Sequence, residues 1–210
     1  MTRDQFLVLV TPVLPECPVP LIMVTAIEVI EDFVRRTSAW AQVIDSDVTF
    51  AGVSEYQLSA PAKASIMDLQ AVSVGGAPVI PRPMLRIAKE SSNWATATAA
   101  RPSHYEFTGS GNLVLWPTPS ESGLQIDVVA RLVPVDSMTE LPDAVMRTYR
   151  FAIADGVKSR LMLMPGVDWR NEALGVHHGE RYEAAISEAA SRTISGGSTA
   201  EHIIPPVKFG

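Results

Sequence analysis

The chain has 210 residues, of which 47% are hydrophobic and 19% are charged, and its formal net charge at pH 7 is −6. This length allows one large domain or two small ones, and the apolar content excludes a wholly disordered protein. The acidic balance argues against tight binding to nucleic acid, because such binding depends on Lys and Arg neutralising phosphates.

The first 41 residues predict helices. Residues 3–10 form a short helix with Phe6, Leu7 and Val10 on one side, and four prolines between positions 12 and 20 then impose an extended link. A long helix follows over residues 20–40, with a wide apolar face. The start of the chain lacks the basic and long apolar regions of a signal peptide, and no window reaches the roughly 18 apolar residues of a membrane helix.

The middle of the chain, residues 42–138, changes to short alternating runs that are typical of strands. Residues 124–132 alternate so regularly that we expect a half-buried antiparallel strand. Gly75-Gly76 indicates a turn, and residues 85–92 are long enough for one or two helical turns. The remaining strand candidates are 55–58, 65–72, and a hairpin of 104–107 and 112–116 around Gly109-Ser110-Gly111.

Helical periodicity returns after residue 141. One helix is expected over 142–164, where Ala152, Ala154 and Gly156 would let a neighbouring helix approach closely. Pro165-Gly166 ends it, and a last helix starts near Asp168 or Asn171, either of which can cap it.

The predicted fold class is therefore α+β: a helical bundle body of three long helices with an inserted small antiparallel β domain and an extended C-terminal tail. The predicted segments are the N-terminal helices of the bundle (1–41), the inserted β-rich domain (42–138), the C-terminal helical hairpin (139–194) and the extended arm (195–210).

A search for chemistry finds no catalytic, cofactor or metal residues. His177 and His178 are neighbours on a helix, so their rings point about 100° apart and do not converge on one ion, and a surface or subunit contact is the better interpretation. Cys17 stands alone, which excludes an intrachain disulfide and favours a buried thiol. Ser110 lacks the pattern of a nucleophile elbow. Asp143 is expected to cap its helix, and Asp155 to be solvated or paired between subunits.

Four cationic residues make parts of the 142–164 helix basic. A solvated or interfacial face is the ordinary interpretation, and contact with an acidic partner is the sharper alternative. Trp169 joins them as a candidate for a subunit interface, because Trp is common at interface hot spots. The subunit-interface candidates are Arg147, Arg150, Lys158, Arg160 and Trp169.

Three stretches resemble the head-to-tail adaptor, or connector, proteins of tailed bacteriophages. They are residues 6–18 with the helix that ends at 31–40, residues 102–105 with 113–119, and Leu141-Pro142-Asp143 with 152–162 and 164–169. The chain departs from the family pattern at Val157, where alanine is common, and in the two-histidine segment 175–180.

The resemblance implies a non-enzymatic virion protein, made in the host cytoplasm and located in the neck. Such proteins form a ring, typically of twelve subunits, beneath the portal protein, and they extend the DNA channel and dock a tail or nozzle protein. The ring passes DNA without sequence-specific binding and contacts no membrane. By the same resemblance, residues 195–210 would be the portal-binding arm, with its apolar and proline residues as the contacts: Ile203, Ile204, Pro205, Pro206, Val207 and Phe209.

Two alternatives stay open at this point. One is a neck, stopper or tail-completion protein lower in the tail stack. The other is a small hydrolase, which would need polar residues that converge in a pocket.

Overall fold

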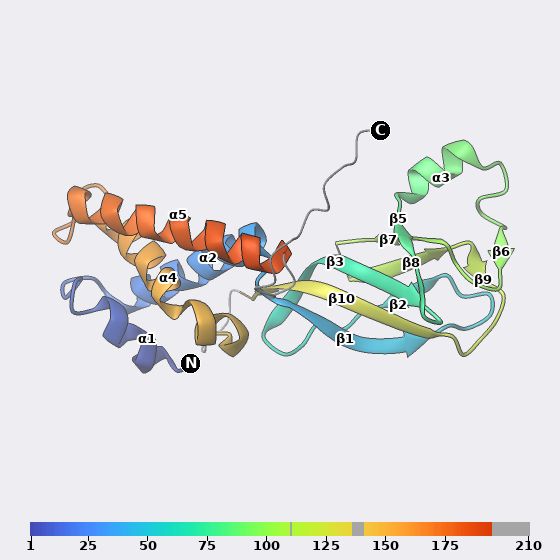
Figure 1. The fold of residues 1–210 in the computed structure, drawn as a ribbon, viewed down its shortest axis with the longest axis horizontal. Coiled ribbons are helices and arrows are strands. Elements are labelled where there is room, and N and C mark those ends of the chain that lie inside the picture. The colour runs from blue at the N-terminus through green and yellow to red at the C-terminus, as the bar shows by residue number, and fades with distance from the viewer. Residues whose placement is uncertain (110, 136–140, 195–210) are drawn as a thin grey trace, which may run out of the picture.

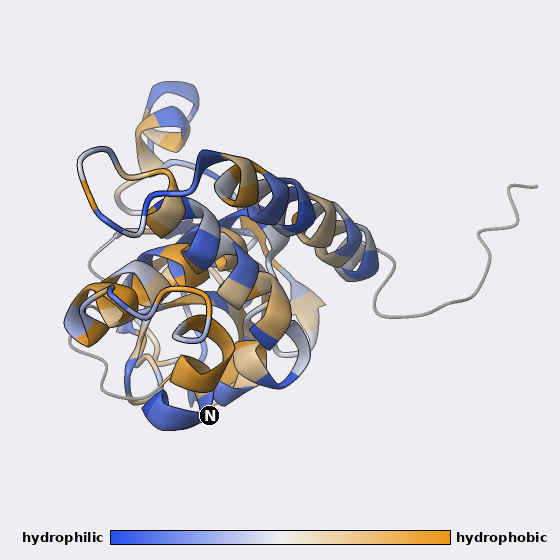
Figure 2. Ribbon diagram, turned by 90° about the vertical axis from the view of Figure 1, so that its left-hand side faces the viewer, coloured by the Kyte–Doolittle hydropathy of each residue, from blue (hydrophilic) through white to orange (hydrophobic). Residues whose placement is uncertain are grey.

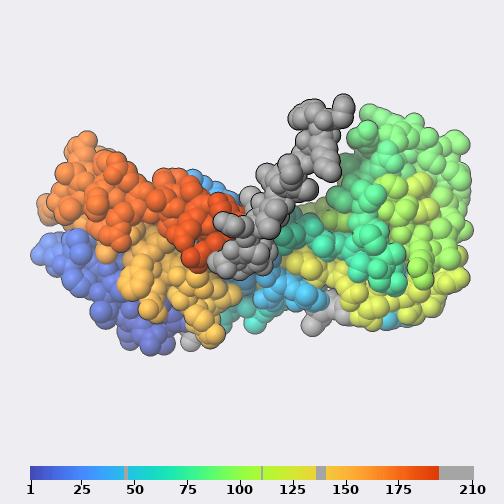
Figure 3. Space-filling view, in the orientation of Figure 1, coloured from blue at the N-terminus to red at the C-terminus, as the bar shows by residue number. Residues whose placement is uncertain are grey.

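The computed structural model describes residues 1–109, 111–135 and 141–194, and leaves out the side chains of residues 45, 46 and 194. Ser110, residues 136–140 and the predicted arm 195–210 lie outside this description. The molecule is elongated, with helices at one end and sheets at the other (Figures 1 and 3). The α+β class is confirmed.

The helical body consists of α1 (Arg3–Val10), α2 (Val19–Thr37), α4 (Asp143–Met162) and α5 (Glu172–Ile194). The prediction of a body made of three long helices is wrong in its helix count, because short α1 packs against α2 and α4. Its Phe6 and Val10 are fully buried, so a short amphipathic helix joins the core beside the long ones. A fifth helix, α3 (Met84–Glu90), lies among the sheets.

The helix ends follow from local chemistry. The Thr2 hydroxyl accepts a hydrogen bond from the Gln5 backbone N–H and completes a capping box at the start of α1. Helix α2 ends because Ser38 adopts a left-handed conformation, with φ of 55°. The Asn171 side chain accepts a hydrogen bond from the Leu174 N–H at 3.1 Å, which confirms the predicted cap of α5. Asp143 does not cap α4, because Pro142 occupies that position.

Sheet A has the strand order β1 (Ala41–Val48), β10 (Gln125–Pro134), β3 (Ala64–Val74) and β4 (Ala77–Pro78), and neighbouring strands are antiparallel. The predicted alternation of β10 is confirmed: Ile126, Val128, Ala130 and Leu132 are each at most 1% exposed. Strand β1 was not predicted. Its register shifts between Ile44 and Asp47, and this irregularity interrupts the alternation by which a strand is recognised.

Sheet B has the order β2 (Glu55–Gln57), β8 (Asn112–Trp116), β7 (His104–Phe107) and β5 (Ile80–Pro81). The hairpin of β7 and β8 is confirmed. The expected wholly antiparallel arrangement is not, because β5 pairs with β7 in parallel, and so does β6 (Thr98–Ala99) with β9 (Thr118–Pro119). A parallel pair needs a crossover connection, which α3 supplies between β5 and β7 and the β7–β8 hairpin supplies between β6 and β9, a separate two-stranded sheet.

Sheet A meets the helical body directly, and the buried side chains of both ends form one continuous hydrophobic cluster. At the junction, the Leu132 N–H donates to the Trp40 carbonyl at 2.9 Å. The Arg131 guanidinium forms an ion pair with Asp68 and donates to the Ser38 hydroxyl at 2.7 Å. The predicted division into segments 1–41, 42–138, 139–194 and 195–210 stays a prediction.

Candidate functional site

Helix α4 is the centre of the helical body. Over residues 153–157 every side chain is buried, so this part of the helix has no solvent face. The predicted close approach of a neighbouring helix occurs at Gly156. A Cβ there would lie 2.7 Å from Val29 Cγ1 on α2 and 2.9 Å from Tyr182 Cδ2 on α5, so both helices use the space that glycine leaves.

Asp155 of α4 joins α4 to α5 in the interior. Its two carboxylate oxygens lie 2.9 Å from His178 Nδ1 and 3.1 Å from Arg181 Nε. Both Asp155 and His178 are buried. Solvation or a subunit contact for Asp155, and a surface contact for His178, are therefore wrong predictions. Residue spacing could not find this pair, because the two residues belong to different helices and are 23 positions apart.

A second polar link ties α2 to α5. The Tyr182 hydroxyl lies 3.1 Å from the Val29 carbonyl and 2.9 Å from Asp32 Oδ2, and it can donate to either. Burial, together with the neighbouring Asp32 carboxylate, raises the pKa of Tyr182 well above its ordinary value of 10. On the same side, Arg36 Nη1 donates to Glu183 Oε1 at 2.8 Å. These contacts hold the three long helices in register.

The five predicted interface residues do not form one surface. Arg160 lies over α2, 3.6 Å from Glu28 and 3.7 Å from Asp32, so it pairs within the chain. Lys158 is half-buried, and this burial is the main cause that lowers the pKa of its amino group. The nearby Asp155 raises this pKa in part, and Arg181 lowers it further. Trp169 packs partly buried against the core, and its Nε1–H has no hydrogen-bond partner among the described residues.

Arg147 and Arg150 are exposed, as an interface would require. They line a hollow of about 390 Å³ between α1 and α4, together with Gln5 and Met146. The Arg150 guanidinium lies 4.9 Å from the ring centre of Phe151, which itself is 58% exposed. An exposed aromatic ring with a cation stacked on it is well placed to contact another protein surface, because Arg and aromatic side chains are common in binding hot spots.

Large apolar side chains are exposed on every helix of the helical body. Figure 2 looks onto the end of this body away from the sheets, and hydrophobic positions lie beside hydrophilic ones on the visible helices. Sequence periodicity missed these residues because it assigns apolar positions to the core. They are Val8, Val24, Phe151, Leu163, Leu174 and Val176, each more than 40% exposed.

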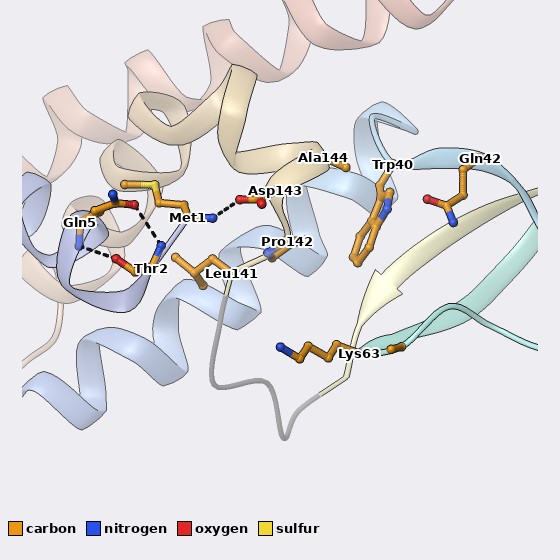
Figure 4. Close-up of a pocket in the computed structure, with 11 residues that line it drawn as sticks. Met1, Thr2, Gln5, Trp40, Gln42, Lys63, Leu141, Pro142, Asp143 and Ala144 are labelled. Carbon is orange, nitrogen blue, oxygen red and sulfur yellow. Dashed lines mark hydrogen bonds and ion pairs between the residues drawn. The ribbon is translucent and has the colours of Figure 1, made fainter.

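The described residues contain no set that converges for catalysis. A hollow of about 600 Å³ lies where the helical body meets sheet A, and Asp143 and Lys63 are the titratable side chains among the residues that line it (Figure 4). Asp143 is engaged with the Met1 amino group in an ion pair. Burial raises the pKa of the Cys17 thiol, which opposes formation of a nucleophilic thiolate. Among the described residues, no three His, Cys, Asp or Glu side chains gather closely enough to hold a metal ion.

Comparison with known proteins decides the family. The family model described as SU10 adaptor protein matches residues 14–201. The chain belongs to the SU10 adaptor protein family. This is a phage head-to-tail adaptor family, which confirms the resemblance drawn from the three stretches of sequence. No curated protein matches the chain.

Membership in the SU10 adaptor family assigns a structural role, which fits the exposed apolar and cationic residues better than the hydrolase alternative does. In the described part of the chain, no helix has both the length and the apolar character needed to cross a membrane. The predicted portal contacts, Ile203 to Val207 and Phe209, lie outside the described residues, although the family match extends to residue 201.

Proposed function

We propose that this protein is a head-to-tail adaptor that assembles as a ring, of twelve subunits, beneath the portal protein in the virion neck. The ring extends the DNA channel and docks a tail or nozzle protein. The observation that carries this proposal is the SU10 adaptor match over residues 14–201. The predicted division into helical segments, inserted β domain and arm belongs to the same proposal.

The surface of the helical body supports self-association. Exposed apolar side chains that cluster on one part of a protein mark interaction sites. In a closed ring each subunit presents two different surfaces to its neighbours, so both sides of the helical body need contact residues. Phe151 with Arg147 and Arg150 on α4 supplies one such set. Helix α5 adds exposed Leu174 and Val176, which point to different sides of their helix because they are two positions apart.

The segment 195–210 is proposed as the portal-binding arm. It follows α5, whose last turn has exposed Ser191 and Arg192. Its apolar residues Ile203, Ile204 and Val207 stand beside Pro205-Pro206, and short apolar segments with prolines are suited to docking in a groove on a partner.

The net charge of −6 is compatible with a channel for DNA. An acidic wall repels phosphates, so DNA slides past without being held. We expect no cofactor and no sequence-specific contact with DNA.

Addition of the protein to purified portal rings, followed by mass photometry, tests the proposal. We expect the full chain to add about twelve subunits per portal ring, the number typical of connectors with closed ring symmetry. A chain truncated after Arg192 should add none. The variant Ile203→Ser/Ile204→Ser should also fail, whereas Ser198→Ala/Thr199→Ala, changed in the same segment, should load normally.

Three outcomes argue against parts of this proposal. Equal loading by the truncated chain removes the role of the arm but keeps the ring. Loading with a stoichiometry other than twelve replaces the proposed subunit number. Binding to tail proteins without binding to portal would move the protein to a stopper or tail-completion position lower in the stack.

A further inference from the structure

The charges of the sheet-containing end are sorted by sign along the chain. Residues 79–101 carry four cationic side chains, Arg82, Arg86, Lys89 and Arg101, against one carboxylate, Glu90. The flanking stretches 37–62 and 102–130 carry six carboxylates and no lysine or arginine. A molecule of net charge −6 thus has one locally cationic region surrounded by acidic ones.

The cationic region forms a projecting surface around α3, which we call the α3 surface: Ile80, Arg82, Leu85, Arg86 and Lys89. Arg82 and Arg86 both pair with Glu90, and the Glu106 carboxylate accepts a hydrogen bond from the Met84 N–H at 3.2 Å at the start of α3, so the positive charge in excess comes from Lys89. Lys89 makes no ion pair within the described residues. Leu85 is 70% exposed and Ile80 61%, so apolar and cationic groups are presented together.

The opposite side of the same end is acidic and also apolar. We call it the distal surface: Phe50, Glu121 and Asp127, all of them exposed. Hydrogen bonds hold its segments together, because the Thr49 hydroxyl donates to the Glu121 carbonyl at 3.0 Å and the Ala51 N–H donates to the Ser122 hydroxyl at 2.9 Å. Phe50, 52% exposed, therefore lies beside Glu121.

The two surfaces cannot meet within one copy. In Figure 1, α3 stands at the top of the sheet-containing end, whereas β1 and the start of β10 run along its bottom. The space-filling view shows the same separation between the green and the yellow segments (Figure 3). Complementary patches on opposite sides of one molecule suit a heterologous, head-to-tail contact between copies, which closes into a ring when the rotation allows it.

We propose that the α3 surface of one copy docks onto the distal surface of the next copy around the ring. The partner is a second copy of this chain, because the charges and the exposed apolar groups of the two surfaces match. This inference rests on the ring proposed above and adds to it a contact made by the sheets. Such a contact is steered by charge and weakens with salt.

Charge reversal on each side tests the contact. Lys89→Glu/Arg101→Glu makes the α3 region acidic without breaking a described ion pair, and Glu121→Lys/Asp127→Lys makes the distal surface basic. Loading onto portal rings is read by mass photometry at low salt. Each variant alone should need at least about tenfold more protein for half-maximal loading, since like charges facing each other cost several kcal/mol.

An equimolar mixture of the two variants should load like the unmodified protein, because alternating copies again place opposite charges in contact. A chain that carries all four reversals should also load. Arg3→Glu/Arg170→Glu lowers the net charge of the helical body by as much as the α3 variant does and disrupts the exposed Arg170–Glu172 ion pair; it is the control for the α3 variant and should load normally.

Cross-linking supplies a second test. In a Cys17→Ala background, a chain with Leu85→Cys and Phe50→Cys treated with a bifunctional maleimide on portal should give a ladder of linked copies. Chains with either cysteine alone should give none.

The outcomes separate this inference from the ring itself. If the unmodified protein does not load, both fail. If it loads and the single-side variants load equally well, the ring stands and the proposed contact is wrong. Normal loading of the α3 variant with loss of tail attachment would also overturn the contact, and would assign the α3 surface to a tail protein instead.

Discussion

In the helical body, charged side chains pair across helices inside the molecule, whereas at the sheet-containing end some exposed charges stay outside the ion pairs that Arg82, Arg86 and Arg131 make. Asp155, His178 and Arg181 illustrate the first arrangement, with both carboxylate oxygens of the aspartate engaged. Lys89 and Asp127 illustrate the second, because both are exposed and neither makes an ion pair within the described residues. The same residue types thus support stability at one end and are available for association at the other.

The largest effect on the free energy of unfolding is expected for Asp155→Ala. Loss of the carboxylate leaves buried His178 without its acceptor, and removal of one partner from a buried polar pair costs about 3–5 kcal/mol. Urea unfolding should show this loss in the free energy of unfolding. Asp155→Asn, which keeps a hydrogen-bond acceptor for His178 but loses the charge, should cost less. Equal costs for the two variants would contradict the role of the hydrogen bond and would assign the whole effect to the charge.

Gly156→Ala should have the next largest effect. The new methyl group would meet Val29 and Tyr182 at under 3 Å, and overpacking of this kind costs about 1–3 kcal/mol. Alanine gains up to about 1 kcal/mol in helix propensity, so we expect a net loss of about 1–2 kcal/mol. Gly52→Ala is unsuitable as a control because of its positive φ, whereas Gly109→Ala meets no neighbour and should be nearly neutral. A stabilised Gly156→Ala variant would contradict the close packing.

Tyr182→Phe should cost about 1 kcal/mol through the lost hydrogen bonds and should change the response to alkaline pH. The pKa of Tyr182 is raised in the folded protein, so its contribution to stability is fully present below pH 10 and is lost as the pH rises above 10. This one group accounts for a slope of up to about 1.4 kcal/mol per pH unit.

The pH dependence has a matched control. Tyr56 and Tyr105 also have a raised pKa because of burial, so Tyr182→Phe should reduce the alkaline slope and not abolish it. Unfolding curves between pH 9 and 11 measure this. An unchanged slope would mean that Tyr182 ionises as readily in the folded state as in the unfolded one.

The smallest effect on the free energy of unfolding is expected at the sheet-containing end. Lys89→Glu/Arg101→Glu should change the free energy of unfolding by less than about 0.5 kcal/mol, because exposed charges away from ion pairs contribute little. A large loss of stability would show that these charges support the fold and would remove the contrast between the two ends.

Sequence patterns predicted the elements that bury a single regular face. The alternation in β10 and the β7–β8 hairpin are examples, since each repeats a simple period. Strand β1 was missed because its irregularity breaks that period. Helix α1 was predicted within the N-terminal helices of the bundle but was left out of the count of three long helices, although its Phe6 and Val10 are fully buried.

The candidate site was harder to predict than the fold. Arg147 and Arg150 are exposed as expected, but Arg160 faces α2, and the cationic pattern on α4 could not distinguish the two cases. The sequence shows that residues 79–101 are cationic and that their flanks are acidic. Only the structure shows that α3 and the strands of sheet A lie on opposite sides of the molecule, so the contact between copies could not be predicted from the sequence.

The junction between the two ends also determines how the molecule carries mechanical load. Strands β1, β10 and β3 run side by side along the long axis, from the helical body into the sheet-containing end (Figure 1). A pull along that axis is borne by the covalent backbones of β1 and β10. A bending force must instead slide neighbouring strands past each other, and it strains the whole ladder of hydrogen bonds perpendicular to them at once. We therefore expect sheet A to resist bending between the helical body and the sheet-containing end.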